Sequence, residues 1–325
     1  MSRLVSTPSA HLHAERHAHP SAPMRVLVTG SSGFLGRQVA RELAVHSGFE
    51  VIGFDLRPSP DGDFESIEAD LCELPAVRKA CHGIAAVVHF GGVGDVDLAA
   101  EHPEIAAAAN VVGTTNVAIS AREAGARVVY ASTWEVYGRP ITRTIDELHP
   151  CDPHHIYAVT KLAGEQILRA EHRSAGLPIA ILRLGTAYGR GMRANTVISR
   201  FVTSGHAGRP LLVQGDGRQW RQFTHTSDIA RAVQIVLESR WSDLVLNVAS
   251  DELVTVRRLA DLVSRRYDIP VSFGPARQGD PLPARISTAR ASRTVGWRAE
   301  VEFIDGLSDL LDHLDADCTT AANVL

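Results

Sequence analysis

A glycine-rich segment near the start of the chain constrains the fold more than any other feature. Residues 29–36, TGSSGFLG, follow an apolar run at 26–28 and lead into a helix-like stretch at 37–45. A strand, a glycine turn and a helix in this order predict the first unit of a doubly wound α/β sheet. Gly30 can take the positive φ that a tight turn needs, because it has no side chain. Gly36 lets the helix pack close to the strand.

The same segment has the chemistry of a phosphate-binding turn. Gly33 leaves room for a pyrophosphate to approach the backbone, and the N–H groups that open the helix, on Phe34 and Leu35, can donate to its oxygens. A second apolar run ends at Asp55, whose carboxylate can accept hydrogen bonds from both ribose hydroxyls and would repel a 2′-phosphate. The pattern therefore predicts NAD rather than NADP. Arg57 is the opposing signal, because an arginine here can pair with a 2′-phosphate.

From Met24 onward, strand-like runs rich in Val and Ile alternate with amphipathic, helix-like runs. This alternation predicts a parallel sheet covered by helices on both faces. The expected strands are 25–29, 50–55, 86–90, 127–131, 178–182 and 244–248. The expected helices are 37–45, 74–80, 103–124, 157–175, 227–238, 256–266 and 303–314.

The predicted fold class is α/β, a Rossmann-like doubly wound parallel sheet with a smaller C-terminal substrate-binding lobe. We expect a disordered, histidine-containing leader at 1–23 and an NAD-binding domain at 24–182. Residues 183–325 are expected to form mainly the lobe, with some elements returning to the sheet. The lobe should lie over the carboxyl edge of the sheet, where ligands bind in such folds.

Composition narrows the classes of function. The formal net charge of −4 argues against nucleic acid as the main partner. No apolar stretch is long enough to span a bilayer, so no membrane partner is expected. The four cysteines form no CxxC pair and are expected to be reduced thiols in a cytoplasmic protein. We predict no metal site, and we expect the histidines of the leader to take no part in the chemistry.

Two segments carry groups suited to taking a proton from an alcohol. Tyr157 and Lys161 stand four residues apart in a helix-like run, so they share one helix face. A free phenol has a pKa near ~10, and a neighbouring ammonium and a cationic nicotinamide favour the phenolate that accepts the proton. The strand expected at 127–131 leads into Thr133 at the same sheet edge. Thr133 is predicted to bridge the substrate oxygen and Tyr157.

Taken in order, these motifs resemble the extended short-chain dehydrogenase/reductase family, specifically its nucleotide-sugar epimerase and dehydratase branch. The resemblance runs from about residue 24 to residue 314. It rests on TGSSGFLG, Asp55, Asp70-Leu71, HFGG at 89–92, NVVGT at 110–114, STWEVYG at 132–138, YAVTK at 157–161, GDG at 215–217 and RQFTH at 221–225.

The resemblance implies roles for several further residues. Asp70 and Leu71 would border the adenine, and Asn110 would order the active site. The cofactor would be lined by His89, Phe90, Gly91 and Gly92. Arg221 and Arg277, with Asp280 nearby, would lie near the nucleotide part of a substrate, a task that suits arginine because its planar fork binds phosphate oxygens in pairs.

The resemblance also implies a tightly held NAD that oxidises C4 of a sugar attached to a nucleoside diphosphate. The 4-keto intermediate then has three fates: reduction from the other face, loss of the C5 proton followed by loss of water from C6, or loss of a 6-carboxylate as CO₂. Glu135 stands where dehydratases and decarboxylases of this branch carry a glutamate beside C5 and C6. Simple 4-epimerases usually carry an uncharged residue there.

Three positions depart from the pattern near the predicted substrate. Trp134 replaces the aspartate that protonates the departing hydroxyl in one dehydratase class, and an indole N–H cannot do so. Thr186 replaces the asparagine that usually touches the diphosphate. We expect both side chains to contact the substrate. Gly91-Gly92 replaces the commoner Ala-Ala, which predicts a looser or re-shaped pocket near the nicotinamide.

We therefore predict an NAD-dependent epimerase that acts on a nucleoside-diphosphate sugar through a transient 4-keto intermediate. Two other enzymes remain open, a 4,6-dehydratase or UDP-glucuronate-type decarboxylase that uses Glu135, and an NAD-dependent dehydrogenase or reductase of a non-nucleotide alcohol. A non-catalytic NAD-binding scaffold is a different class, and the presence of Thr133, Tyr157 and Lys161 argues against it. The resemblance further implies a homodimer that pairs the helices expected at 103–124 and 157–175.

Overall fold

The computed structural model describes residues 22–59, 62–276 and 284–322 of the 325-residue chain. Residues 1–21, which hold nearly all of the predicted leader, lie outside the described residues.

The main sheet has seven strands, all parallel, in the order β12-β7-β5-β4-β1-β2-β3. Its strands are β1 (Met24–Thr29), β2 (Phe49–Asp55), β3 (Glu65–Glu68), β4 (Ala86–His89), β5 (Arg127–Thr133), β7 (Ile179–Leu184) and β12 (Asp243–Val248). This order reverses between β1 and β4, where ligands bind in doubly wound sheets. The predicted fold class is confirmed. The edge strand β3 has no counterpart among the expected strands, because its sequence ESIE contains a single apolar residue.

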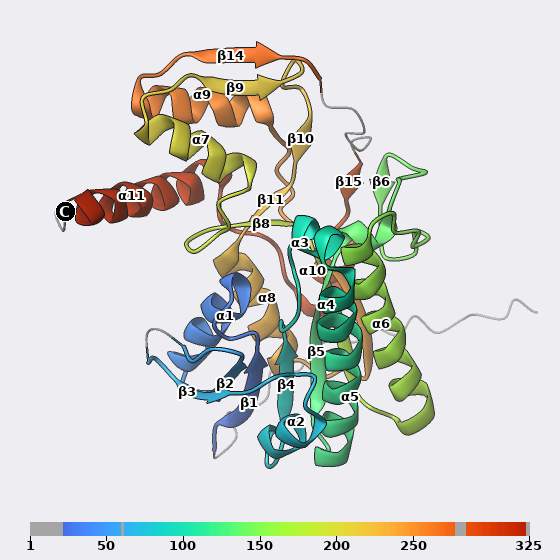
Figure 1. Ribbon diagram of the computed structural model, residues 1–325. Helices are drawn as coiled ribbons and strands as arrows, with labels where there is room; N and C mark the ends of the chain where they lie inside the picture. The colour runs from blue at the N-terminus through green and yellow to red at the C-terminus, as the bar shows by residue number, and fades with distance from the viewer. Residues whose placement is uncertain (1–21, 60–61, 277–283, 323–325) are drawn as a thin grey trace, which may run out of the picture.

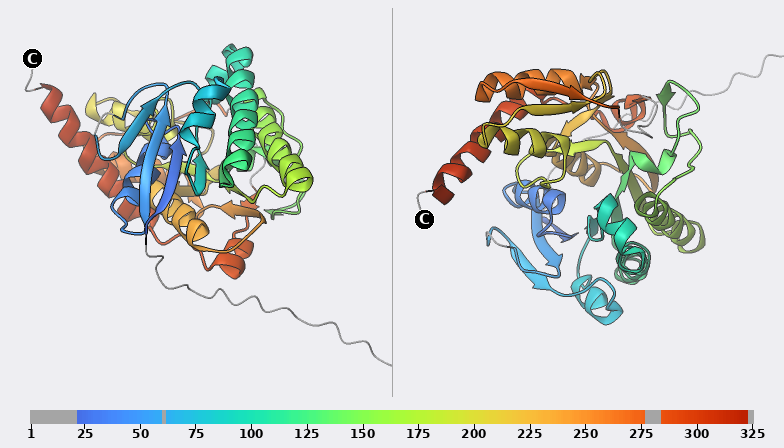
Figure 2. Two further views of the ribbon diagram at one scale, coloured as in Figure 1. Left: turned by 90° about the horizontal axis from the view of Figure 1, so that it is seen from below. Right: turned by 45° about the horizontal axis from the view of Figure 1, so that its top comes forward.

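Helices cover both faces of the sheet (Figures 1 and 2), which explains why the inner strands are apolar on both sides. One face carries α1 (Phe34–Ala44), α8 (Thr226–Glu238) and α10 (Ala289–Val295). The other carries α2 (Leu74–Ala80), α5 (Gly113–Ala124) and α6 (Ile156–Ala175). A separate apolar cluster fills each interface.

The region expected as one helix at 103–124 is interrupted. It consists of α4 (Pro103–Ala107), a π-helical turn (Ala108–Val112) and α5, and the short helix α3 (Val96–Glu101) precedes it. A π-helical turn inserts an extra residue per turn, and such turns occur often at functional sites. Here it carries Asn110.

The later chain builds a lobe with its own apolar core, beyond the carboxyl ends of the main strands (Figure 1). Its helices are α7 (Val197–His206), α9 (Val256–Tyr267) and α11 (Phe303–Ala322). Its short strands pair as β8 (Thr186–Tyr188) with β11 (Phe223–His225), β9 (Leu211–Gln214) with β14 (Val271–Gly274), β10 (Trp220–Arg221) with β13 (Val254–Thr255), and β6 (Thr144–Ile145) with β15 (Arg285–Ile286).

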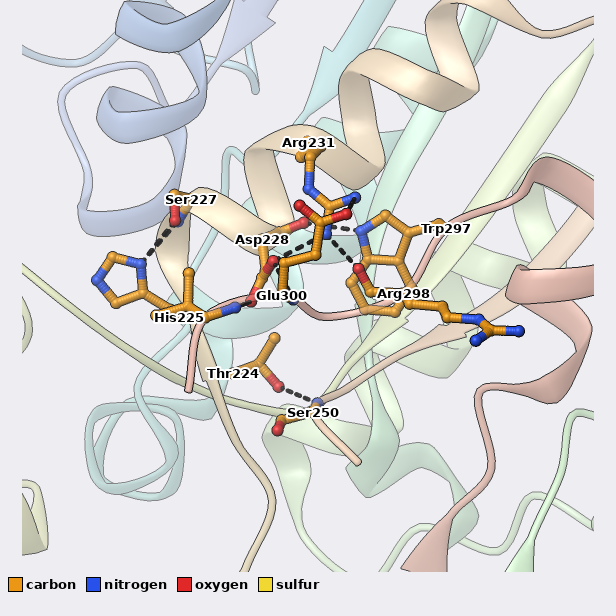
Figure 3. Close-up of polar contacts among 10 residues, drawn as sticks. Thr224, His225, Ser227, Asp228, Arg231, Ser250, Trp297, Arg298 and Glu300 are labelled. Atoms are coloured by element: carbon orange, nitrogen blue, oxygen red, sulfur yellow. Dashed lines mark hydrogen bonds and ion pairs between the residues drawn. The ribbon is translucent and has the colours of Figure 1, made fainter. Parts of the chain in front are cut away.

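A buried carboxylate, that of Asp228 in α8, ties the C-terminal chain to the sheet (Figure 3). Its Oδ1 accepts hydrogen bonds from the Glu300 N–H and from Arg231, both at 2.9 Å, and its Oδ2 accepts one from the Val301 N–H at 3.1 Å. Trp297 donates its indole N–H to the Asp228 carbonyl at 3.0 Å. Because each carboxylate oxygen has a donor, the charge is compensated and the segment after α10 is held against α8.

Candidate active site

The glycine turn after β1 is packed so tightly that it excludes side chains. Gly30 has φ +71°, and a Cβ there would lie 2.7 Å from the Gly91 nitrogen. A Cβ on Gly36 would lie 2.1 Å from the Gly30 carbonyl oxygen. Both contacts are shorter than any real Cβ makes, so the predicted turn and the close approach of α1 to β1 both depend on glycine.

The first turn of α1 suits an anion. The helix begins at Phe34, and Gly33 before it supplies no side-chain acceptor for the first N–H groups. The first turn also contains no acidic residue. The N–H groups that follow Gly33 are therefore available to phosphate oxygens, in the position where a dinucleotide pyrophosphate binds. The residues present thus fit NAD.

Asp55, at the end of β2, lies beside this turn. Its Oδ2 accepts a hydrogen bond from the Ser32 N–H at 3.0 Å, and its Oδ1 accepts a longer one from the Arg57 N–H at 3.4 Å. Ser32 also donates its hydroxyl to the Arg57 carbonyl at 2.7 Å. The carboxylate thus joins β2 to the glycine turn, and each oxygen keeps a lone pair for a ribose hydroxyl.

No empty space is left at the positions where Gly91 and Gly92 lack a Cβ atom. A Cβ on Gly91 would lie 2.4 Å from Leu71 Cδ1, and a Cβ on Gly92 would lie 2.2 Å from Asn110 Oδ1. The side chains of Leu71 and Asn110 therefore occupy the space that two alanine methyls would take. The looser or re-shaped pocket near the nicotinamide stays a prediction. Phe90 is half-buried just before these glycines.

His89 lies beneath the cofactor cleft rather than along it. Its ring is fully buried, with Nδ1 at 2.7 Å from Thr29 Oγ1 and Nε2 at 3.0 Å from Thr114 Oγ1. Burial and the charge of Lys161 lower the pKa of His89 to about 3, so the ring is neutral. The direct contact with the cofactor that the resemblance implies for His89 is therefore wrong, because the ring has no exposed surface.

Asn110 connects three segments under the cleft. Its Oδ1 accepts the Val93 N–H at 2.8 Å, and its Nδ2 donates to the Val93 carbonyl and to Thr160 Oγ1, both at 2.9 Å. Thr160 in turn donates to the Tyr157 carbonyl at 2.8 Å. Asn110 therefore positions the backbone of α6 next to Tyr157. Asp70 has a local contact, since its Oδ1 accepts the Cys72 N–H at 2.8 Å ahead of α2.

The hydroxyl of Thr133 lies close enough to the phenol of Tyr157 to lower the pKa of that phenol. Thr133 is the last residue of β5, and Tyr157 stands in the first turn of α6. Lys161 lies one turn further along α6, 6% exposed, with Nζ 4.2 Å from the centroid of the Tyr130 ring. The sequence-predicted proton-transfer group is therefore assembled at one point on the carboxyl edge of the sheet.

Burial controls the protonation of these groups. It lowers the pKa of Lys161 to about 7, against the opposing charge of Glu165. It also raises the pKa of Tyr157 above the ordinary value for a phenol, with a further rise from the charge of Glu135, while the hydrogen bond from Thr133 lowers it. A positive charge above the phenol is needed to reverse this rise, and a cationic nicotinamide has that charge.

A buried ion pair supports α6. Glu165 accepts hydrogen bonds from Arg183 at 2.7 and 3.0 Å and from the Ser132 hydroxyl at 2.5 Å. Ser132 precedes Thr133 on β5, and Glu165 follows Lys161 by one turn of α6. The pair therefore sets how α6 is placed against the end of β5.

Glu135 lies in the single 3₁₀ turn after β5, and its side chain is 29% exposed. Burial raises its pKa to about 7, although the positive charges of Arg193 and Arg221 lower it. Within the described part of the chain, its carboxylate accepts no hydrogen bond. The Nε2 atom of His155 lies 3.9 Å from Glu135 Oε2.

Two residues of this site were not predicted from the sequence. Arg193 comes from the loop before α7, donates to the Gly94 carbonyl and pairs with Asp95 at 3.0 Å. The sequence of a loop does not indicate which distant segment the loop will contact. His155 caps the N-terminus of α6. A polar residue is expected at that position, which was the one available signal.

The other predicted substrate residues lie in several elements. Trp134 is half-buried in the same 3₁₀ turn as Glu135, and Thr186 opens β8. The charge of Arg221 in β10 is near enough to Glu135 to lower its pKa. Arg277 and Asp280 lie outside the described residues.

Comparison with known proteins identifies the family. Residues 26–249 match the NAD dependent epimerase/dehydratase family, and the protein belongs to it. MoeE5, solved in complex with UDP-glucuronic acid and NAD, is 31% identical with a TM-score of 0.83, and the match covers 90% of this chain and 99% of that one.

Two further relatives differ in their chemistry. A dTDP-glucose 4,6-dehydratase of Streptomyces niveus is 29% identical over 310 residues, which are 89% of this chain and 92% of the relative. A putative UDP-glucose 4-epimerase of Methanocaldococcus jannaschii is 26% identical over 304 residues, which are 89% of this chain and 98% of the relative.

The predicted family is thus confirmed, and so are the enzyme class at the level of epimerase or dehydratase and the cofactor NAD. Every helix among the described residues is too short or too polar to cross a bilayer. The same residues contain no group of three or more His, Cys, Asp or Glu placed to hold a metal ion.

Proposed function

We propose that the protein is an epimerase that acts on a nucleoside-diphosphate sugar through a transient 4-keto intermediate. The observation that carries this proposal is the proximity of the Thr133 hydroxyl to the Tyr157 phenol at the end of β5, with Lys161 one helical turn away. This arrangement suits removal of a proton from a secondary alcohol and its later return.

We propose that Thr133 binds the 4-hydroxyl of the sugar and passes its proton to Tyr157. Lys161 helps to keep the phenolate, since an ammonium beside it favours the charged form. Bound NAD supplies the hydride acceptor and later the hydride donor. When the 4-keto group is reduced from its other face, Tyr157 returns the proton to the new hydroxyl and the 4-epimer forms.

The cofactor would be held by residues at or after the ends of β1, β2, β3 and β4, and by residues of α6. We propose that the first turn of α1 binds the pyrophosphate and that Asp55 binds the adenosine ribose. The proposed contacts are with Gly30, Gly33, Phe34, Leu35, Gly36, Asp55, Asp70, Leu71, Phe90, Gly91 and Gly92, and with Tyr157 and Lys161 at the nicotinamide. Asn110 would act by holding the backbone beside Tyr157.

The nucleotide part of the substrate would meet Arg221 and Thr186, with Trp134 nearer the sugar. Arg277 is proposed for the same subsite on the resemblance alone. Because MoeE5 was solved with UDP-glucuronic acid, a uronic acid is among the sugars to test first.

A second candidate function uses Glu135. Its carboxyl group lies close enough to Tyr157 to affect the pKa of the phenol, and its own pKa of about 7 suits a group that both accepts and gives a proton. Such a group is suited to C5 and C6 chemistry, which would make the enzyme a 4,6-dehydratase or a decarboxylase. Trp134 argues against the dehydratase that needs a neighbouring acid.

One experiment separates these outcomes. The purified enzyme is incubated with UDP-, dTDP-, GDP- and CDP-sugars in D₂O, and the products are identified by NMR and mass spectrometry. A 4-epimer, with or without deuterium at C5, supports the proposed function. Loss of water or of CO₂ would replace it with the second candidate, and accumulation of reduced cofactor with any substrate would indicate a net dehydrogenase.

We also propose that the enzyme is a cytoplasmic homodimer. The four cysteines are free, which fits a reducing compartment. Exposed apolar side chains gather on α3, α4, the π-helical turn and α6, which are neighbours in the fold. They are Leu98, Ile105, Val112, Ile156 and Val159. An apolar face of this kind suits burial against a second copy, and sedimentation of the purified protein tests it.

A further inference from the structure

We infer that His155 is a positioning residue that donates a hydrogen bond to Glu135 and keeps its carboxylate ionised. Glu135 and His155 would then form a second proton-handling pair beside Thr133 and Tyr157. This inference extends the proposed function, because it gives the same site a base next to the carbon that is oxidised.

The ring of His155 is held on two sides. Its Nδ1 accepts the Ala158 N–H at 3.4 Å as the N-cap of α6. Its plane is stacked on the ring of Tyr157, with the centroids 6.0 Å apart and 7° between the planes. Since Nδ1 is an acceptor, the neutral ring carries its proton on Nε2.

That N–H is directed to Glu135. The distance from Nε2 to Glu135 Oε2 is 3.9 Å, about 1 Å longer than a hydrogen bond. Hydrogen bonds of catalytic groups are often long before substrate binds and shorten in the complex. Because the ring of His155 is capped and stacked, the shortening would come from rotation of the Glu135 side chain, which is 29% exposed.

The surrounding charges make His155 a neutral donor rather than a cation. Burial and the charge of His154 lower the pKa of His155, and protonation of Nδ1 would also break the cap on α6. Glu135 faces His155 and Tyr157 on α6, Arg193 in the loop before α7, and Arg221 in β10. A donor that reaches only the charged form of a carboxyl lowers its pKa, so His155 opposes the effect of burial.

The pair accounts for one proton transfer. The Glu135 carboxylate would take the proton from the carbon next to the 4-keto group, and the C–H electron pair would pass into the carbonyl as an enolate. The proton on Glu135 exchanges with solvent, and Glu135 returns a proton to the same carbon when the enolate collapses. His155 neither gains nor loses a proton, because its Nδ1 lone pair is already used.

The test measures the titration of Glu135 directly in the NAD-loaded enzyme. Infrared difference spectra follow the carbonyl band of the protonated carboxyl group against pH, and Glu135→Gln identifies that band by removing it. His155→Phe keeps a flat ring against Tyr157 and removes the donor. We expect it to raise the pKa of Glu135 by about one unit. An unchanged titration midpoint would overturn the inference.

A matched variant separates the donor from the cap. His155→Asn keeps an N-cap acceptor for α6 but is too short to reach Glu135. It should raise the pKa of Glu135 as His155→Phe does, while its melting temperature stays closer to that of the wild type. If only His155→Phe shifts the titration, capping rather than hydrogen bonding explains the effect and the inference is wrong.

A kinetic measurement gives a second readout. With the nucleotide sugar that is turned over fastest, exchange of the C5 proton with D₂O is followed against pH. In the wild type the rate of exchange should decrease as the pH is lowered below about 7. His155→Phe should move this decrease to higher pH. If no nucleotide sugar is turned over, the proposed function fails, but the infrared titration still decides the role of His155.

Discussion

Asp228 and Glu135 are carboxylates of the same chain in very different surroundings. Asp228 is 2% exposed and accepts two backbone N–H groups and an arginine. Glu135 is 29% exposed and, among the described residues, has only the distant N–H of His155. The difference indicates which kind of carboxylate is a candidate for a catalytic role. A carboxylate with matched donors holds structure, and one that is partly buried without donors is ready to meet a substrate.

The largest effect that this comparison predicts is on rate, at Tyr157. Tyr157→Phe removes the group that accepts the proton, so turnover should fall by about 10²- to 10⁴-fold. The fold and the bound NAD should be retained, because the substitution removes one hydroxyl and keeps the ring that stacks on His155. Steady-state kinetics and the NAD content of the purified variant check both statements.

Tyr137→Phe is the matched control. Tyr137 lies in the 3₁₀ turn beside the site and donates its hydroxyl to Asn247 at 2.6 Å. Its loss should lower stability and leave turnover within a few-fold of the wild type. A Tyr157→Phe enzyme with more than a tenth of the wild-type rate would contradict the assignment of the base.

The next effect is on stability, at Asp228. Asp228→Ala leaves Arg231 and two backbone N–H groups without their acceptor, and removal of one partner from a buried charged network costs about 3–5 kcal/mol. Urea denaturation at fixed NAD concentration measures it. Glu300→Ala is the control, because that side chain is 71% exposed and its ion pair with Arg231 should contribute less than about 1 kcal/mol. Equal losses for the two variants would show that the Asp228 carboxylate is not the anchor.

Substitution of Glu135 should raise the free energy of unfolding above neutral pH, whereas substitution of Asp228 should lower it. Its pKa is about 7 in the folded protein against 4.5 in the unfolded chain, so the folded state binds more protons between these pH values. Stability therefore falls as pH rises from about 4.5 to about 7, by on the order of 2 kcal/mol after allowing for partial exposure. Glu135→Gln removes this dependence, and its unfolding free energy relative to the wild type should be higher at pH 8 than at pH 5. Parallel pH profiles for the two proteins would refute the raised pKa.

The smallest effect is on cofactor affinity, at Asp55. Asp55→Ala removes the acceptor for the ribose hydroxyls, and the dissociation constant for NAD should rise about tenfold. Asp55→Asn keeps an oxygen for the Ser32 N–H, which separates support of the turn from binding of the ribose. Calorimetric titration of cofactor-free protein measures both. An unchanged affinity in Asp55→Ala would exclude the ribose contact.

The sequence predicted long, periodic elements well and short ones poorly. The expected strand at 127–131 lies within β5, and the helix expected at 74–80 has the bounds of α2, because both have a clear apolar period. The edge strand β3 and the two-residue strands of the lobe have too few apolar positions to show one. The π-helical turn at Ala108–Val112 depends on packing against neighbouring segments, and no local pattern encodes it.

The same division holds within the site. The order of the motifs in the sequence predicted that Thr133, Tyr157 and Lys161 act together, because the carboxyl ends of parallel strands lie at one edge of the sheet. It could not predict that Leu71 and Asn110 would fill the space over Gly91 and Gly92, or that His155 would face Glu135. Those contacts join residues from different elements and depend on how the elements pack.

The sequence alone therefore determined the doubly wound sheet and the dinucleotide turn, and it predicted the groups that we propose move the proton. These follow from short-range rules, namely the freedom of glycine, the period of apolar residues and the four-residue spacing of a helix face. Tertiary structure decided the protonation of Glu135, the neutrality of His89 and the neighbours of Tyr157. Burial and the distance between charges control pKa values, and both exist only after distant segments have packed together.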